Sequence, residues 1–170
     1  EVNHLSMAFN PEHPFLFIIG GAKFDTKLPL VEKFLPIVDT VFVGGALAND
    51  FFRAKGENIG DSLVSDKDLD LSGFINNSKI ILPVDHILKG TAIMDAGLNT
   101  IEILRKEIDN VKFVLWNGPL GAYEQGYKSG TLQLSEMLAD ATKRGVKTVV
   151  GGGDTLATIA ELKLEDSFTF

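Results

Sequence analysis

The chain has 170 residues, of which 45% are hydrophobic and 23% are charged, and it contains no cysteine. This composition predicts a folded domain with a core of its own, and it excludes disulfides, thiolate metal sites and a cysteine nucleophile. The net charge of −7 argues against nucleic acid or an anionic membrane as a partner. The sequence shows neither a long apolar run nor a signal-peptide pattern, so we expect a cytoplasmic protein.

Short apolar runs rich in β-branched and aromatic residues recur along the chain, and most of them stop at small residues. The expected strands cover residues 15–19, 40–43, 79–82, 112–116, 148–150 and 168–170. These runs are continuously apolar rather than alternating. That pattern is typical of parallel strands that are covered by helices on both faces.

The intervening segments carry helical patterns, and we expect helices over residues 27–37, 46–55 and 131–144. Asn99, with Glu102 three residues later, predicts a further helix start, and Ser65 with Asp68 is a weaker signal of the same kind. Strands that alternate with helices predict an α/β fold, a doubly wound parallel sheet of about six strands in three layers. The carboxyl ends of the strands then share one edge, where such folds bind ligands.

The first glycine-rich segment at a strand end is Gly20-Gly21, which is followed by Lys23 and Lys27. Lysines four positions apart share a face on a first helical turn. Their ammonium groups repel each other unless an anion lies between them, so this spacing favours an anion site. The alternative is a solvated helix start with two surface lysines.

A second segment, Gly151-Gly152-Gly153-Asp154-Thr155, opens a helix after a buried strand. Exposed backbone N–H groups and the positive end of a helix make such a turn a phosphate site. Asp154 offers a carboxylate to Mg²⁺, provided that phosphate oxygens complete the coordination. The alternative is a tight turn with Asp154 as an ordinary N-cap.

Two weaker signals lie at other strand ends. Asn117 and Glu124 offer an amide and a carboxylate suited to sugar hydroxyls, or else they belong to a rigid turn. Gly44-Gly45 provides a flat surface for a planar base, or else close packing of helix on strand. Trp116 is expected in the core, and His86 is expected in a loop.

Standard motifs of the P-loop, dinucleotide-binding and α/β-hydrolase types do not occur. The residues alone therefore leave open a non-catalytic nucleotide- or dinucleotide-binding module, or a scaffold domain whose glycines only form turns. A comparison of ADP binding with NAD binding would test the nucleotide- or dinucleotide-binding module. Strand ends scattered over the molecule, rather than meeting in one crevice, would favour the scaffold domain.

Taken together, these segments resemble the C-terminal, nucleotide-binding lobe of the phosphoglycerate kinase family. The matching stretches are residues 20–23 with Lys27, 43–46, 82–85, 116–121 with Glu124, and 151–155. The resemblance implies reversible phosphoryl transfer between 1,3-bisphosphoglycerate and ADP, giving 3-phosphoglycerate and ATP, with Mg²⁺. It also implies a monomer.

The resemblance assigns Lys23, Lys27, Gly152 and Gly153 to catalysis and Asp154 to the metal. It assigns to nucleotide binding Lys23, Lys27, Gly44, Gly45, Gly97, Asn117, Pro119, Glu124, Gly151, Gly152, Gly153, Asp154 and Thr155.

Three departures from the family pattern accompany the resemblance. Residues 1–13 look like the end of a helix joining two lobes, and the phosphoglycerate-binding N-terminal lobe is absent. The nucleotide-binding lobe, residues 14–170, stops before another glycine-rich loop. The stretch 88–94 is shorter than usual and lacks the family's hairpin beside the base. We therefore expect this chain alone to bind nucleotide weakly and to be inactive.

Overall fold

The computed structural model describes residues 10–170. The strands of the main sheet are β1 (Phe15–Ile19), β2 (Thr40–Val43), β3 (Ile80–Ile81), β6 (Phe113–Asn117) and β7 (Lys147–Gly151). The helices are α2 (Phe24–Phe34), α3 (Gly45–Ala54), α4 (Leu98–Asp109), α5 (Ser129–Lys143) and α6 (Gly153–Glu161). A hairpin of β4 (His86–Lys89) and β5 (Ala92–Ala96), and two short 3₁₀ turns, η1 (Tyr123–Gln125) and η2 (Glu165–Ser167), complete the structure.

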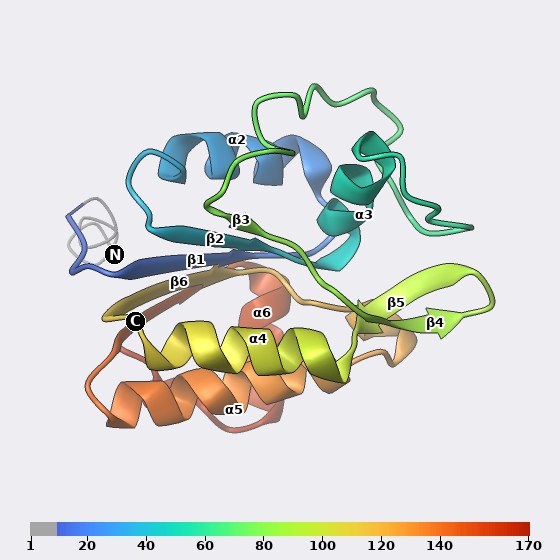
Figure 1. Ribbon diagram of the computed structural model, residues 1–170. Helices are drawn as coiled ribbons and strands as arrows, with labels where there is room; N and C mark the ends of the chain where they lie inside the picture. Colours follow the sequence, from blue (N-terminus) through green and yellow to red (C-terminus); the bar gives the residue numbers. More distant parts are fainter. Residues whose placement is uncertain (1–9) are drawn as a thin grey trace.

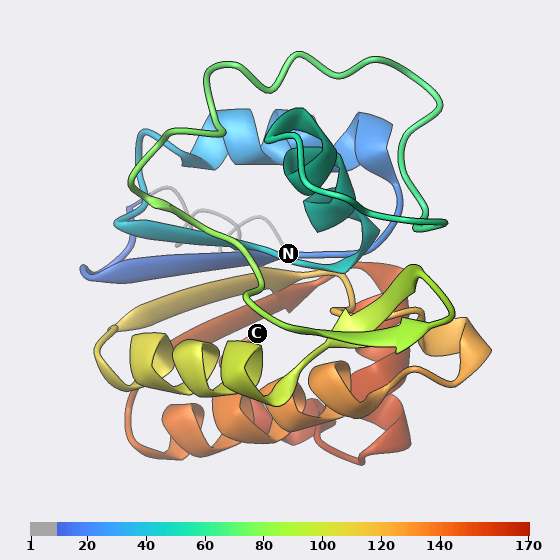
Figure 2. The same cartoon turned by 45° about the vertical axis from the view of Figure 1, so that its right-hand side comes forward.

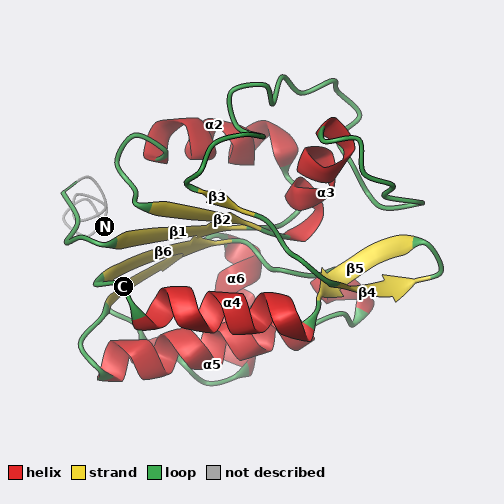
Figure 3. Ribbon diagram, in the orientation of Figure 1, coloured by secondary structure: helices red, strands yellow, loops and turns green. Residues whose placement is uncertain are grey.

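The main sheet is parallel throughout, with strand order β3-β2-β1-β6-β7 (Figures 1 and 3). The chain therefore builds outward from β1 through β2 to β3, and then returns to add β6 and β7 on the other side of β1. The order reverses between β1 and β6, which makes the carboxyl ends of these two strands the topological switch point. The doubly wound α/β prediction is confirmed.

Helices cover both faces of the sheet, with α2 and α3 on one side and α4, α5 and α6 on the other (Figures 1 and 2). Strand β1 is apolar without alternation because it is buried on both faces. Phe15 and Phe17 belong to the core under α2 and α3, and Leu16 and Ile18 belong to the core under α4 and α5. Trp116 is fully buried in the second core, as expected.

The expected helices are present, but α2 covers Phe24–Phe34 rather than residues 27–37. Helix α4 begins at Leu98 rather than Asn99, and its cap comes from Asp85. The Asp85 carboxylate accepts hydrogen bonds from the backbone N–H groups of Asn99 (2.9 Å) and Thr100 (2.8 Å). Asp85 lies in the loop after β3, so the local Asn99–Glu102 pattern did not identify the true cap.

The second cap signal, at Ser65, was wrong, because no helix follows it. The backbone N–H of Ser65 donates to the buried carboxylate of Asp50 (3.2 Å), and its hydroxyl accepts from the backbone N–H of Lys67 (3.1 Å). These two bonds hold the segment in an irregular turn. Helix α5 ends at Lys143, one residue before the expected end at residue 144, and Gly145 follows with a φ of +96°.

Three expectations about strands need correction. His86 is not a loop residue, because it begins β4 of the short antiparallel hairpin. The stretch 88–94, expected to lack a hairpin, lies within this β4–β5 hairpin. Residues 168–170 form no strand, so the sheet has five strands and the hairpin stands apart from it. Phe170 nevertheless exchanges backbone hydrogen bonds with β7, at Val150 (2.7 Å) and Thr148 (3.0 Å).

The expected interlobe helix end, residues 1–13, lies mostly outside the described residues, and residues 10–13 form no helix. Within residues 10–170, none of the helices combines the length and the apolar character that crossing a membrane requires.

Candidate functional site

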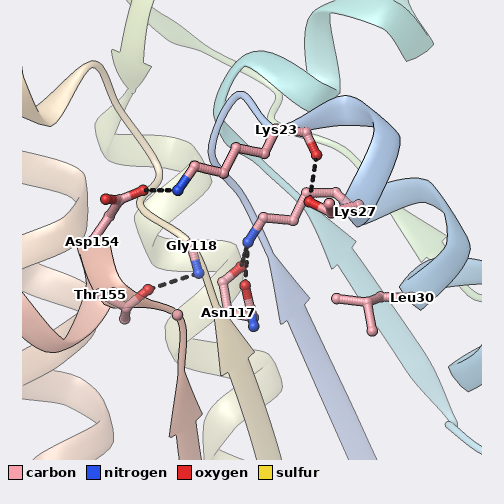
Figure 4. A pocket seen from close by; sticks show the side chains of 10 residues that line it. Lys23, Lys27, Leu30, Asn117, Gly118, Asp154 and Thr155 are labelled. Atoms are coloured by element: carbon pink, nitrogen blue, oxygen red, sulfur yellow. Dashed lines mark hydrogen bonds and ion pairs between the residues drawn. The ribbon is translucent and has the colours of Figure 1, made fainter.

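The loops that follow β1, β6 and β7 meet around a cavity of about 260 Å³ at the switch point of the sheet (Figure 4). Its lining residues are Lys23, Thr26, Lys27, Leu30, Asn117, Gly118, Gly152, Gly153, Asp154 and Thr155. Three of the five expected strand ends, those of β1, β6 and β7, therefore converge on one cavity, and the ends of β2 and β3 do not line it. This convergence argues against a scaffold domain with scattered strand ends. The β2 end lies beside this group, since the backbone N–H of Leu47 donates to the carbonyl of Gly21.

The two lysines reach different partners instead of facing each other. Lys23 immediately precedes α2, and its exposed ammonium lies 3.6 Å from the carboxylate of Asp154. Lys27, one turn into α2, is only 8% exposed. Its ammonium donates to the side-chain oxygen of Asn117 and lies 3.5 Å from the Asn117 backbone carbonyl (Figure 4).

Burial lowers the pKa of the Lys27 ammonium, and the charge of Lys23 lowers it further, while Asp154 acts in the opposite direction. The oxygens that contact this ammonium are both neutral, so no carboxylate bonded to it cancels its charge. A buried, incompletely compensated cation in a cavity is a favourable partner for an anionic ligand.

The loop after β6 is held by buried hydrogen bonds. The Gly118 N–H donates to the Thr155 hydroxyl (2.7 Å), and the Trp116 indole N–H donates to the Gly118 carbonyl (2.8 Å). The Gly20 N–H donates to the Asn117 carbonyl (2.9 Å). These bonds join the loops after β1 and β6 to the first turn of α6, so the cavity wall is a connected unit.

The glycine loop opens α6 toward the cavity. Gly152 precedes the helix with a φ of +94°, a conformation that side chains rarely adopt. A Cβ on Gly153 would meet no atom within 4 Å, so the backbone of this residue is open to a ligand. Free N–H groups at a helix start, together with the helix dipole, attract a phosphate.

Asp154 is the candidate ligand for a magnesium ion in this cavity. Residues 10–170 contain no group of three or more side chains able to ligate a metal, so this carboxylate would act as the protein ligand alone. Mg²⁺ in nucleotide sites is commonly held by one or two carboxylates, with phosphates and water completing its coordination. Asp154 is half-exposed and lies directly after the glycine turn of residues 151–153 (the phosphate-type turn), which fits that arrangement.

The other predicted site residues lie outside the cavity. They are Gly44, Gly45, Gly97, Pro119, Glu124 and Gly151. At Gly45 a Cβ would lie 2.4 Å from the Gly21 nitrogen, so close packing explains this glycine. Gly97 packs against the Asp85 carboxylate, and Glu124 is exposed on η1.

Three residues that line the cavity were not predicted: Thr26, Leu30 and Gly118. Thr26 lies between the two lysines, and Leu30 lies one turn beyond Thr26, so the helical spacing of α2 was the available signal. Gly118 lies within the stretch 116–121, which carries part of the family resemblance.

A model of the family described as Phosphoglycerate kinase matches residues 1–170. The chain belongs to the phosphoglycerate kinase family. The phosphoglycerate kinases of Chloroherpeton thalassium and Chlorobium phaeobacteroides are 42% and 39% identical to it, and each alignment covers 99% of this chain and 49% of the relative. The phosphoglycerate kinase structure from Coxiella burnetii superimposes with a TM-score of 0.88 at 33% identity, covering 99% of this chain and 50% of that one.

The chain thus spans about half the length of the phosphoglycerate kinases it matches. The alignments to the two relatives run over 196 positions, which exceeds the 170 residues of this chain. These kinases therefore carry extra residues within the matched range.

Proposed function

We propose that this chain is the nucleotide-binding half of a phosphoglycerate kinase. The complete kinase would transfer a phosphoryl group reversibly between 1,3-bisphosphoglycerate and ADP, with a carboxyl group as acceptor in the reverse direction. The observation that carries the proposal is the meeting of Lys23, Lys27, Asp154 and the start of α6 around one cavity at the switch point. Phosphoryl transfer depends mainly on positioning and on neutralising phosphate charge, and this cavity offers both.

Each group then has a role that its position supports. The ammonium groups of Lys23 and Lys27 neutralise nucleotide phosphates and the transferring group, and the backbone of Gly152, Gly153 and Thr155 binds phosphate oxygens. Asp154 holds Mg²⁺, whose charge offsets that of the phosphates. Because Lys23 and Asp154 pair in the free chain, nucleotide and metal would separate them.

The outer residues extend the proposed site beyond the cavity. We assign Gly44, Gly45 and Gly97 to the adenosine, and Asn117 and Pro119 to the nucleotide. Glu124 would bind the ribose, and Gly151 would complete the phosphate loop. The phosphoglycerate would be bound by the part of the relatives that this chain does not match. The chain alone is then inactive, because in-line transfer needs both substrates held together. A cytoplasmic location and a monomeric state stay predictions.

Isothermal titration with Mg-ADP tests the proposal on the unmodified chain, Lys23→Ala and Asp154→Ala, with the exposed Lys55→Ala as control. A hydrogen bond to a charged group contributes about 1.5–3 kcal/mol, so each site variant should bind about tenfold more weakly or worse. Lys55→Ala should bind like the unmodified chain. No heat of binding in the unmodified chain would refute the proposal.

The same titration addresses the alternative of a dinucleotide-binding module. NAD replaces ADP in a parallel experiment, and a response to NAD that equals or exceeds the response to ADP would favour that alternative.

A further inference from the structure

The Lys27 side chain runs from α2 across the floor of the cavity and ends at Asn117, at the end of β6 (Figure 4). The two residues lie 90 positions apart in the sequence. Lys27 is 8% exposed, so its ammonium is largely removed from water. A buried ammonium without an acceptor is costly, and Asn117 supplies the acceptors.

A lysine ammonium has three N–H donors. The side-chain oxygen of Asn117 takes one, and the Asn117 backbone carbonyl, 3.5 Å away, lies near a second. At least one donor is left for a ligand in the cavity, so an anion need not displace Asn117. The charged groups that act on Lys27 are Lys23 and Asp154, and these two pair with each other.

The nature of the acceptor matters as much as its position. A carboxylate at this point would form an ion pair and cancel the positive charge that an anion needs. The amide of Asn117 accepts the same hydrogen bond and leaves the charge in place.

Asn117 is itself held firmly. Its carbonyl accepts from the Gly20 N–H, and the residue that follows it is anchored to Thr155. The glycine loop closes the other side, since a Cβ on Gly152 would lie 3.1 Å from the Asn117 side-chain oxygen. The carboxamide therefore stands between Lys27 and the phosphate-type turn, with little room to turn away.

We propose that Asn117 is a positioning residue: its neutral side-chain oxygen holds the Lys27 ammonium at the cavity floor, charged and aimed at an incoming polyphosphate. This role concerns Lys27 and the phosphates, and it is separate from the nucleotide contact proposed for Asn117 above. The polyphosphate part rests on the proposed function, whereas the hold on Lys27 concerns the ligand-free chain.

The test follows the Lys27 side chain directly, by NMR of protein labelled with ¹³C-lysine and titrated from pH 6 to 11. Lys27→Met identifies the signal. The variants are Asn117→Leu, which removes the acceptor, and Asn117→Asp, which adds a charge to it. Asn76→Leu, an exposed asparagine in a turn, is the control. Thermal unfolding is recorded for each variant.

The Lys27 midpoint should fall by about one pH unit in Asn117→Leu, rise in Asn117→Asp and stay unchanged in Asn76→Leu. Unchanged midpoints in both Asn117 variants overturn the proposal. If Asn117→Leu does not fold, Asn117→Asp decides alone. A Lys27 midpoint that does not rise in Asn117→Asp then overturns the proposal. The titration uses no ligand, so failure of the proposed function does not affect it.

Binding of inorganic pyrophosphate, measured by titration calorimetry, then separates positioning from direct contact. Asn117→Leu should weaken pyrophosphate binding about tenfold when Lys27 is present. It should have little effect on binding in a chain that already carries Lys27→Met. An equal loss in both backgrounds means that Asn117 acts on the anion independently of Lys27, which contradicts the proposal. Absence of pyrophosphate and ADP binding in the unmodified chain would count against the proposed function alone.

Discussion

Gly118→Ala tests the packing that builds the cavity wall. Gly118 has a φ of +100°, and a Cβ there would lie 2.3 Å from the carbonyl oxygen of Gly20 and 3.0 Å from the Lys27 ammonium. The Gly20 oxygen belongs to the backbone, so it cannot rotate away as a side chain could. A methyl group must therefore push apart the loops that follow β1 and β6.

The cost has two parts that a control variant separates. A left-handed backbone conformation costs a residue with a Cβ about 1–2 kcal/mol, and overpacking costs about 1–3 kcal/mol more. Gly126 has a φ of +89° but no atom within 4 Å of its Cβ position, so Gly126→Ala carries the first part only. Gly73→Ala has neither a positive φ nor a neighbour and should be close to neutral.

Urea unfolding of the three variants gives the comparison. Gly118→Ala should lose about 1–3 kcal/mol more unfolding free energy than Gly126→Ala, which corresponds to about 2–4 °C of melting temperature for each kcal/mol. Equal losses in the two variants would show that the loops do not approach each other as described, and the cavity geometry would then be wrong.

Two further outcomes follow from the hydrogen bonds around the site. Thr155→Val keeps the buried shape but leaves the Gly118 N–H without its acceptor, so the unfolding free energy should fall by about 1–3 kcal/mol. Thr155→Ser should restore most of this loss. A Thr155→Val variant with unchanged stability would contradict the hydrogen bond. Burial raises the pKa of Asp85, but hydrogen bonds from Thr100 and Asn99 outweigh it and hold the pKa below the ordinary 3.8. A lowered pKa means that the ionised form stabilises the fold above the ordinary pKa and that this stability is lost as the pH falls through the folded pKa. Asp85→Asn should therefore be about 0.5–1 kcal/mol less stable at pH 7, and the gap should close below pH 3.8, measured by thermal unfolding across pH; a gap that does not change with pH would refute the charged cap.

Local patterns in the sequence were enough to predict the five strands of the sheet and the glycine turn before α6, although residues 168–170 form no strand. Apolar runs such as residues 15–19 predict buried strands because burial on both faces leaves no polar position. The glycines at 151–153 predict an open turn because they carry no side chains there. Both signals depend on the residues themselves and their immediate neighbours, so they survive without knowledge of the fold.

Contacts between distant segments were decided by tertiary structure alone. The pairing of β1 with β6 places Asn117 beside Lys27. Lys23 and Lys27 line the same cavity, as their spacing predicted, but only the fold gives them different partners, Asp154 and Asn117. The capping of α4 by Asp85 likewise depends on where the chain after β3 passes. Strand order and loop paths follow from how the helices pack on the two faces of the sheet, and that packing is a property of the whole chain rather than of any one segment.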